Sequence, residues 1–159
     1  MRYLGLDLGT KTLGISISDI TLTIANSLTI LRFNEDDYDA VYPELKKIIE
    51  EYDIKKIILG LPKNMNNTIG DRGLQTLAFK DKLFNWFNID IEMQDERLTT
   101  VEATNYLLEA DMSRKKRKKK IDKIAANIIL QTYLDKRKDW KKWKMKLWHL
   151  KYLMKIIKK

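Results

Sequence analysis

The 159-residue chain contains no cysteine. This absence excludes disulfides and thiolate-bound metals and is compatible with a reducing compartment. No stretch approaches the roughly 20 apolar residues that a membrane span requires. The first residues lack the apolar run of a signal peptide. The single histidine, His149, is assigned no role. An apolar share of 44% is ordinary for a globular protein, so we expect a soluble cytoplasmic protein with a conventional core.

The net charge of +9 is distributed unevenly along the chain. Residues 136–159 contain 11 Lys and Arg against one Asp, whereas residues 1–135 carry a balance of −1. Within the first part, Arg114 opens seven consecutive basic residues that end at Lys120. Concentrated positive charge indicates a polyanionic partner, either nucleic acid or an anionic membrane surface.

The pattern of apolar residues predicts an α/β domain over residues 1–135. Three leading strands precede alternating helices and strands, which favours a mixed sheet with helices on both faces. Pro43 fits only the first turn of its helix. The expected strands are 2–9, 13–19, 22–30, 56–62 and 89–94, and the expected helices are 38–52, 74–87, 99–109 and 121–134.

Asp7 is a carboxylate within an otherwise apolar strand, where burial is costly without a counter-charge. A buried arginine or several amide donors could compensate it, but a divalent cation explains it more economically because hard cations take oxygen ligands. Gly9 and Thr10 follow directly, and a glycine allows the backbone to approach a phosphate closely. Nucleotide-binding phosphotransferases of the actin-like type share this turn. Their fold contains the domain twice, and 135 residues cannot supply the second copy.

Two further acidic positions complete the candidate site. Asp95 and Glu96 lie where the last strand ends, and strand ends are where open α/β sheets bind ligands. Read alone, they could form a solvated turn paired with Arg97, and Asp122 could be an ordinary residue at a helix N-terminus. Taken together, Asp7, Glu96 and Asp122 suit a two-cation site, since gathered carboxylates repel one another unless cations are bound.

Five segments in a fixed order resemble the YqgF family, also called RuvX, within the ribonuclease H-like superfamily. They are Gly5–Lys11 with Gly14, Leu59–Pro62, Asp95–Ala103, Ser113–Arg117 and Ile121–Asp135. The resemblance implies a five-stranded sheet whose first three strands are antiparallel. It also implies that Asp7, Glu96 and Asp122 are catalytic and metal-binding carboxylates, with Asp95 a second candidate for the role of Glu96.

The resemblance implies a metal-dependent nuclease that uses Mg²⁺ or Mn²⁺, with two ions expected. Its expected function is maturation of the 5′ end of precursor 16S ribosomal RNA, in contact with nucleic acid and ribosomal particles. A Holliday-junction DNA nuclease and a non-catalytic RNA-binding assembly factor are the alternatives. Seven side chains are candidates for substrate phosphate contacts: Thr10, Lys11, Arg97, Arg114, Lys115, Lys116 and Arg117.

The extension 136–159 departs from the family, whose members usually end near Asp135. Six large apolar residues recur there at alternating spacings of three and four, which predicts a basic amphipathic helix. They are Trp140, Trp143, Leu147, Leu150, Met154 and Ile157. Packing on the domain or in a homodimer, nucleic-acid binding through stacked Trp side chains, and membrane-surface contact remain three open interpretations.

Overall fold

The computed structural model describes residues 1–97, 113, 124–138 and 144–145. The predicted helix 99–109, the basic run, Asp122 and most of the extension lie outside these residues. Residues 144 and 145 are helical, which leaves the amphipathic helix of the extension a prediction. In the part of the chain that is described, no helix combines the length and apolarity that crossing a membrane would need.

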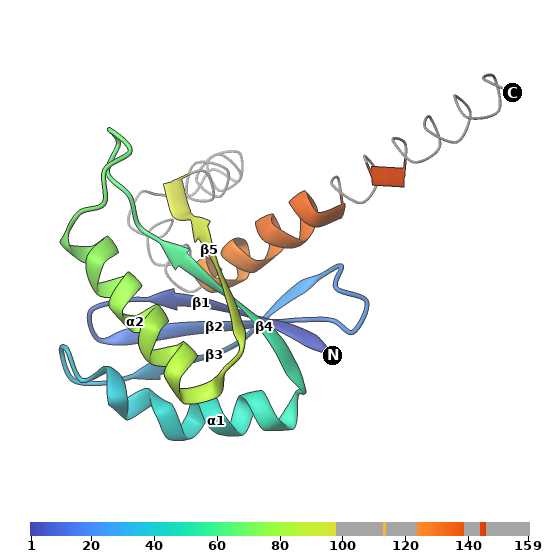
Figure 1. Ribbon diagram of the computed structural model, residues 1–159, viewed down its shortest axis with the longest axis horizontal. Coiled ribbons are helices and arrows are strands. Elements are labelled where there is room, and N and C mark those ends of the chain that lie inside the picture. The colour runs from blue at the N-terminus through green and yellow to red at the C-terminus, as the bar shows by residue number, and fades with distance from the viewer. Residues whose placement is uncertain (98–112, 114–123, 139–143, 146–159) are drawn as a thin grey trace, which may run out of the picture.

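A five-stranded mixed sheet in the order β3-β2-β1-β4-β5 forms the centre of the molecule (Figure 1). The antiparallel pairs β1–β2 and β2–β3 and the parallel pairs β1–β4 and β4–β5 confirm the predicted arrangement. The strands are β1 (Arg2–Leu8), β2 (Thr12–Ser18), β3 (Ala25–Arg32), β4 (Ile54–Leu61) and β5 (Asp90–Asp95). Since β1, β4 and β5 are parallel, their carboxyl ends meet at one edge of the sheet.

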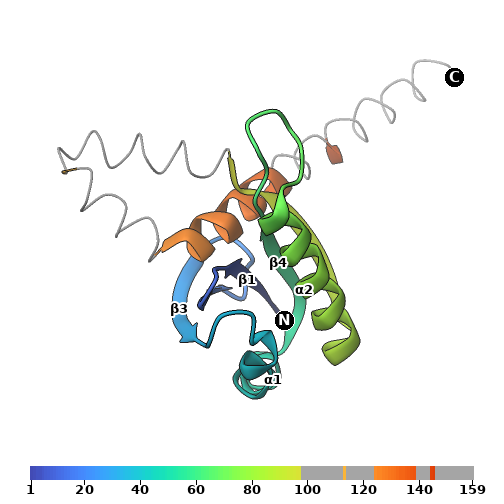
Figure 2. The ribbon, with the colours of Figure 1, turned by 90° about the vertical axis from the view of Figure 1, so that its left-hand side faces the viewer.

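Helices cover both faces of the sheet, as the sequence predicts. On one face, α1 (Tyr42–Glu51) and α2 (Asp71–Phe87) pack on the alternate apolar residues of the strands, with Leu45, Ile48, Phe79 and Leu83 buried. The helix 124–138 lies on the opposite face from α1 and buries Ile129, Leu130 and Leu134 (Figure 2). This helix continues at least four residues beyond the predicted end at 134.

Two element boundaries differ from the predictions for local reasons. The strand predicted from Leu22 begins at Ala25, because the Asp19 carboxylate accepts hydrogen bonds from the backbone N–H groups of Thr23 and Ile24 and closes a turn. The helix predicted over 38–52 is divided into a 3-10 turn, η1 (Tyr38–Val41), and α1. Pro43 stands in the first turn of α1, where its missing N–H costs no intrahelical bond.

Small residues allow the helix 124–138 to lie close to the sheet. The Ser16 hydroxyl donates a hydrogen bond of 2.7 Å to the carbonyl oxygen of Ala126. A methyl group at Gly5 would lie 2.6 Å from Cβ of Leu130 and 2.9 Å from the Ala126 carbonyl oxygen. The helix is therefore held against β1 and β2 at van der Waals distance, which positions its first described turn beside the carboxyl end of β1.

Candidate active site

Asp7 lies near the carboxyl end of β1 on the face covered by the helix 124–138. Its antiparallel partner is Gly14 in β2, and a methyl group at Gly14 would contact Cβ of both Asp7 and Ala126, at 3.6 and 3.4 Å. The Asp7 side chain is half-buried. A carboxylate is thus presented from the centre of the sheet rather than from a solvated turn.

Glu96 reaches the same face from two strands away. It directly follows β5 and begins the next helical turn. Gly60 of β4 provides the passage: a methyl group there would lie 2.5 Å from Cδ1 of Ile129 and still closer to a carboxylate oxygen of Glu96. The missing side chain at Gly60 therefore lets the half-buried Glu96 cross β4 in the direction of β1.

The Glu96 carboxyl group interacts electrostatically with Asp7. Burial and, to a smaller extent, the negative charge of Asp7 raise the pKa of Glu96, and Arg72 acts in the opposite direction, so that the pKa lies at about 7. Two like charges in a half-buried site disfavour each other's ionised form. This donor set fits a divalent cation, because oxygen ligands suit hard ions and bound positive charge would relieve the repulsion.

Asp95 occupies a different environment, although it is adjacent to Glu96. Its carboxylate accepts hydrogen bonds of 2.7 and 3.1 Å from the Arg97 guanidinium, and Lys63 lies 3.8 Å away. The Arg97 hydrogen bond is the main reason that the pKa of Asp95 falls to about 2. Asp95 is thus ionised and paired with Arg97. Glu96, in contrast, interacts with the like charge of Asp7. The catalytic roles of all three remain predictions.

The predicted phosphate-binding residues fall into two groups. Thr10 and Lys11 are exposed in the turn after β1, at the same edge as Asp7, and Lys11 pairs with Glu35 at 3.5 Å. Arg97 lies at this edge also, but its guanidinium is engaged with Asp95 and the loop before α2. Outside the described residues lie Arg114, Lys115, Lys116, Arg117 and Asp122.

The third predicted metal ligand, Asp122, precedes the first described residue of the helix 124–138 by two positions. Within the residues that are described, no group of three acidic or histidine side chains is placed to hold a metal ion. Asp7 and Glu96 are the two predicted ligands that the structure brings together.

Arg72 and Gly60 were not recognised as site residues from the sequence. Arg72, in the first turn of α2, donates a hydrogen bond of 2.8 Å to the carbonyl oxygen of Leu8 and so brings a positive charge near the two acids. A glycine within a β-branched strand was a usable signal for Gly60, because it marks close approach by another group. Arg72 offered no comparable signal, since its contact depends on how α2 docks.

Comparison with known proteins identifies the family to which the chain belongs. Residues 1–136 match the family model described as RuvX, Holliday junction resolvase. The chain belongs to the RuvX family. Relatives named "Putative pre-16S rRNA nuclease" share 47% identity in Enterococcus faecalis and 51% in Clostridium botulinum. Each alignment covers 85% of this chain and 97% of the relative, so the matched region corresponds to nearly the whole length of both.

Solved structures confirm the ribonuclease H-like fold of this RuvX-family chain. Thermus thermophilus RuvC, in a complex with a Holliday junction substrate, has a TM-score of 0.53 at 11% identity, covering 86% of this chain and 95% of RuvC. The fowlpox virus Holliday junction resolvase has a TM-score of 0.50 at 14% identity, covering 86% and 99%. At such low identity the likeness concerns the fold alone.

Proposed function

We propose that this chain is a metal-dependent nuclease that hydrolyses phosphodiester bonds of precursor 16S ribosomal RNA. The observation that carries the proposal is the convergence of Asp7 and Glu96 across Gly60, at the carboxyl edge of the sheet. Membership of the RuvX family and the printed name of its relatives direct the proposal toward this RNA. A cytoplasmic location fits the same substrate.

Asp7 and Glu96, joined by Asp122, would hold the Mg²⁺ or Mn²⁺ ions. When bound, such cations would act as Lewis acids that favour deprotonation of the attacking water and offset negative charge on the phosphate. The protein's part is to hold the acids at fixed positions before substrate arrives. Gly60 leaves space for the Glu96 side chain, and the hydrogen-bonded pair of strands β1 and β4 provides the scaffold that carries Asp7. The attacking oxygen forms a bond to phosphorus while the bond to the leaving sugar oxygen breaks, and that oxygen takes up a proton.

Arg72 has a distinct role in this proposal. Its guanidinium is anchored on the Leu8 carbonyl oxygen and lowers the pKa of Glu96 from nearby. A nearby positive charge favours the ionised carboxylate of Glu96 before a cation binds. Thr10 and Lys11, exposed beside the site, and the basic residues Arg114–Arg117 would contact neighbouring phosphates.

The test is cleavage of a precursor 16S RNA fragment by the wild-type protein and by the Asp7→Asn variant, in Mg²⁺ or Mn²⁺. We expect the wild type to cut and Asp7→Asn to be inactive with an unchanged circular dichroism spectrum. Asp81→Asn makes the same change at an exposed residue of α2. It is the matched control, and this variant should cut normally. Full activity of Asp7→Asn, or activity that survives excess chelator, would contradict the proposal.

A branched DNA substrate is the second candidate, favoured by the description of the family model as a Holliday junction resolvase. The same purified proteins should be offered a four-way DNA junction in parallel. Cutting of the junction with no cutting of the RNA would replace the proposed substrate while leaving the site assignment intact.

A further inference from the structure

The loop between β4 and α2 is well ordered by its own hydrogen bonds, and the proposed chemistry makes no use of it. The Asn67 N–H donates to the Asn64 carbonyl oxygen at 3.0 Å, which closes a tight turn. At the base of this turn, the Asn64 N–H donates to the Thr68 carbonyl oxygen at 2.9 Å. The Asn64 side-chain amide also donates to the Thr68 hydroxyl at 2.9 Å. These bonds fix the conformation of residues 64–68.

Arg97 connects this loop to the end of β5. One terminal nitrogen donates to the Asn64 carbonyl oxygen at 3.2 Å, and the other donates to Oδ1 of Asn67 at 2.7 Å and to Asp95. With the bond from its Nε to Asp95, four of the five guanidinium donors are used within the protein. Arg97 is therefore built as a clamp between loop and strand, which leaves a single N–H for any phosphate.

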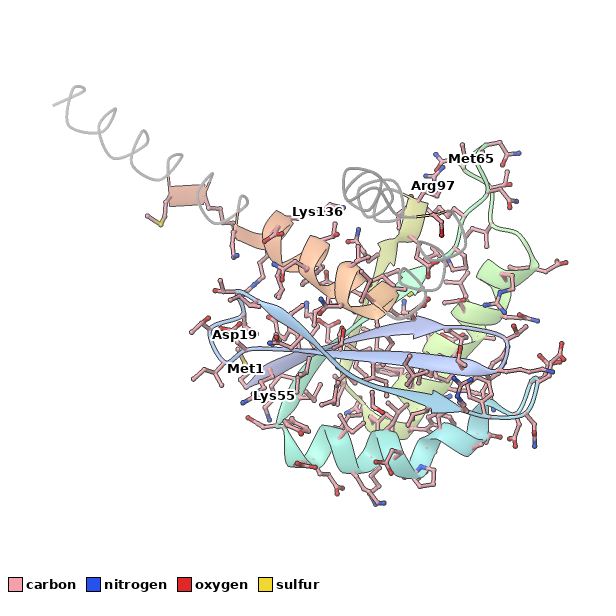
Figure 3. All side chains as sticks on the ribbon, turned by 180° about the vertical axis from the view of Figure 1, so that it is seen from behind. Met1, Asp19, Lys55, Met65, Arg97 and Lys136 are labelled. Atoms are coloured by element: carbon pink, nitrogen blue, oxygen red, sulfur yellow. The ribbon has the colours of Figure 1, made fainter. Side chains whose placement is uncertain are left out.

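Met65 stands at the tip of the clamped loop. Its side chain is 95% exposed, the largest exposed fraction among the large apolar side chains that the structure describes. Figure 3 shows Met65 and Arg97 at one end of the molecule and Asp19 at the other. A loop held by these five hydrogen bonds thus presents an apolar side chain to solvent next to the strand end that precedes Glu96.

We propose that this loop is a preformed substrate-contacting arm, in which Arg97 positions the loop and Met65 packs on the face of an unpaired base next to the cleaved bond. The inference rests on the proposed function, because it takes nucleic acid as the substrate. An unpaired base offers an exposed apolar face, whereas bases within a duplex cover their faces by stacking. A thioether side chain is adaptable and polarizable, which suits contact with any base. The clamp removes the entropic cost of ordering the loop at binding.

The first test compares binding of a single-stranded RNA oligonucleotide with binding of the same sequence in a duplex, by fluorescence anisotropy in chelator. Met65→Ser should weaken single-strand binding by about fivefold, since contact of a thioether with an aromatic ring is worth up to roughly 1.5 kcal/mol. The affinity of Met65→Ser for the duplex should differ from that of the wild type by less than about twofold. Ile20→Ser, 70% exposed in the turn between β2 and β3, is the matched control and should leave both affinities unchanged. No loss, or an equal loss on both RNAs, would overturn the proposal.

The second test separates positioning by Arg97 from direct phosphate contact. Arg97→Gln should weaken single-strand binding as Met65→Ser does, and the double variant should be no weaker than either single variant, since both act through one loop. The salt dependence of binding should keep its slope. A phosphate contact predicts instead a slope smaller by about 0.7, additive losses, and recovery by Arg97→Lys, which retains the charge. That set of results would overturn the assignment of Arg97.

These binding measurements do not depend on cleavage. A wild-type protein that binds single-stranded RNA through Met65 but cuts no RNA would contradict the proposed function and support the arm. A protein that cuts normally, with Met65→Ser indistinguishable from the wild type on every substrate, would contradict the arm alone.

Discussion

The sheet face under the helix 124–138 carries buried charge at both of its ends, and the two ends are built in opposite ways. At one end Lys56, whose side chain is 18% exposed, pairs with Asp90 at 2.8 Å and with Glu92. The same ammonium lies 6.0 Å from the ring centres of Tyr3 and Tyr133. At the other end, two acids, Asp7 and Glu96, repel each other.

The two ends differ in whether the charge is compensated within the protein. Burial opposes the charge of Lys56, but its hydrogen bonds to Asp90 and Glu92 more than compensate and raise its pKa. That end is complete without any ligand. At the carboxyl edge burial and Asp7 together raise the pKa of Glu96 to about 7, so the metal-free protein bears an electrostatic cost there. Perturbed groups of this kind concentrate at functional sites.

The largest contrast is expected between Glu96→Gln and Glu92→Gln, the same substitution at the two ends. Glu96→Gln should lower the cleavage rate by on the order of 10²-fold or more, because under the proposed function it removes a cation ligand worth several kcal/mol of transition-state stabilisation. Glu92→Gln, 44% exposed, should leave the rate unchanged. Single-turnover cleavage measures both, and equal rates for the two variants would remove the distinction.

Gly60→Ala tests whether the passage across β4 places Glu96. The added methyl group would meet the Glu96 carboxylate and Ile129. We expect cleavage to fall by on the order of 10²-fold, as small displacements of reacting groups do, and stability to fall by about 1–3 kcal/mol from overpacking. The control is Gly14→Ala, whose methyl group makes ordinary contacts of 3.4 Å or more with the described residues. A fully active Gly60→Ala variant would show that the position of Glu96 does not depend on the missing side chain at Gly60.

The fold was largely predictable because its signals are local. Apolar patterning located all five strands, by alternation in β2 and β5 and by apolar runs in β1 and β4, and the acidic position after the last strand pointed to Glu96. The contacts that complete the edge were not predictable, because they join distant segments. Arg72 reaches Leu8 only once α2 has docked. Pairing of Arg97 with the acidic turn was one interpretation of the sequence, but nothing near Arg97 in the sequence indicates Asn64 and Asn67 as further partners.

Lys56→Met addresses the paired end and should change stability without changing chemistry. It removes the cation from between Asp90 and Glu92 and from two tyrosine rings, and we expect a loss of about 1–2 kcal/mol. Lys55→Met is the matched control: its ion pair with Asp53 is more than half exposed on both sides, so we expect a much smaller loss of stability. Urea unfolding gives both values, and the cleavage rate per folded molecule should be that of the wild type. Equal stability losses would show that Lys56 is no better paired than its neighbour.

The last prediction is a pH dependence of stability in chelator. The pKa of Glu96 is 4.5 in its ordinary state and about 7 in the folded protein, so the folded state binds more protons between these values. The free energy of unfolding therefore gains a contribution that is present below pH 4.5 and lost as the pH rises through 7. Comparison of urea midpoints for the wild type and Glu96→Gln over this range isolates it. Identical dependences of the urea midpoint on pH for the two proteins would show that the pKa of Glu96 is not raised in the folded protein.

The central claim is that the two acids at the carboxyl edge of the sheet bind a divalent cation, and calorimetric titration with Mn²⁺ tests it most directly. The wild type and the Asp81→Asn control should bind Mn²⁺ alike, while Asp7→Asn and Glu96→Gln should each lose at least about tenfold in affinity. Mn²⁺ binding of undiminished strength in both Asp7→Asn and Glu96→Gln would contradict the account.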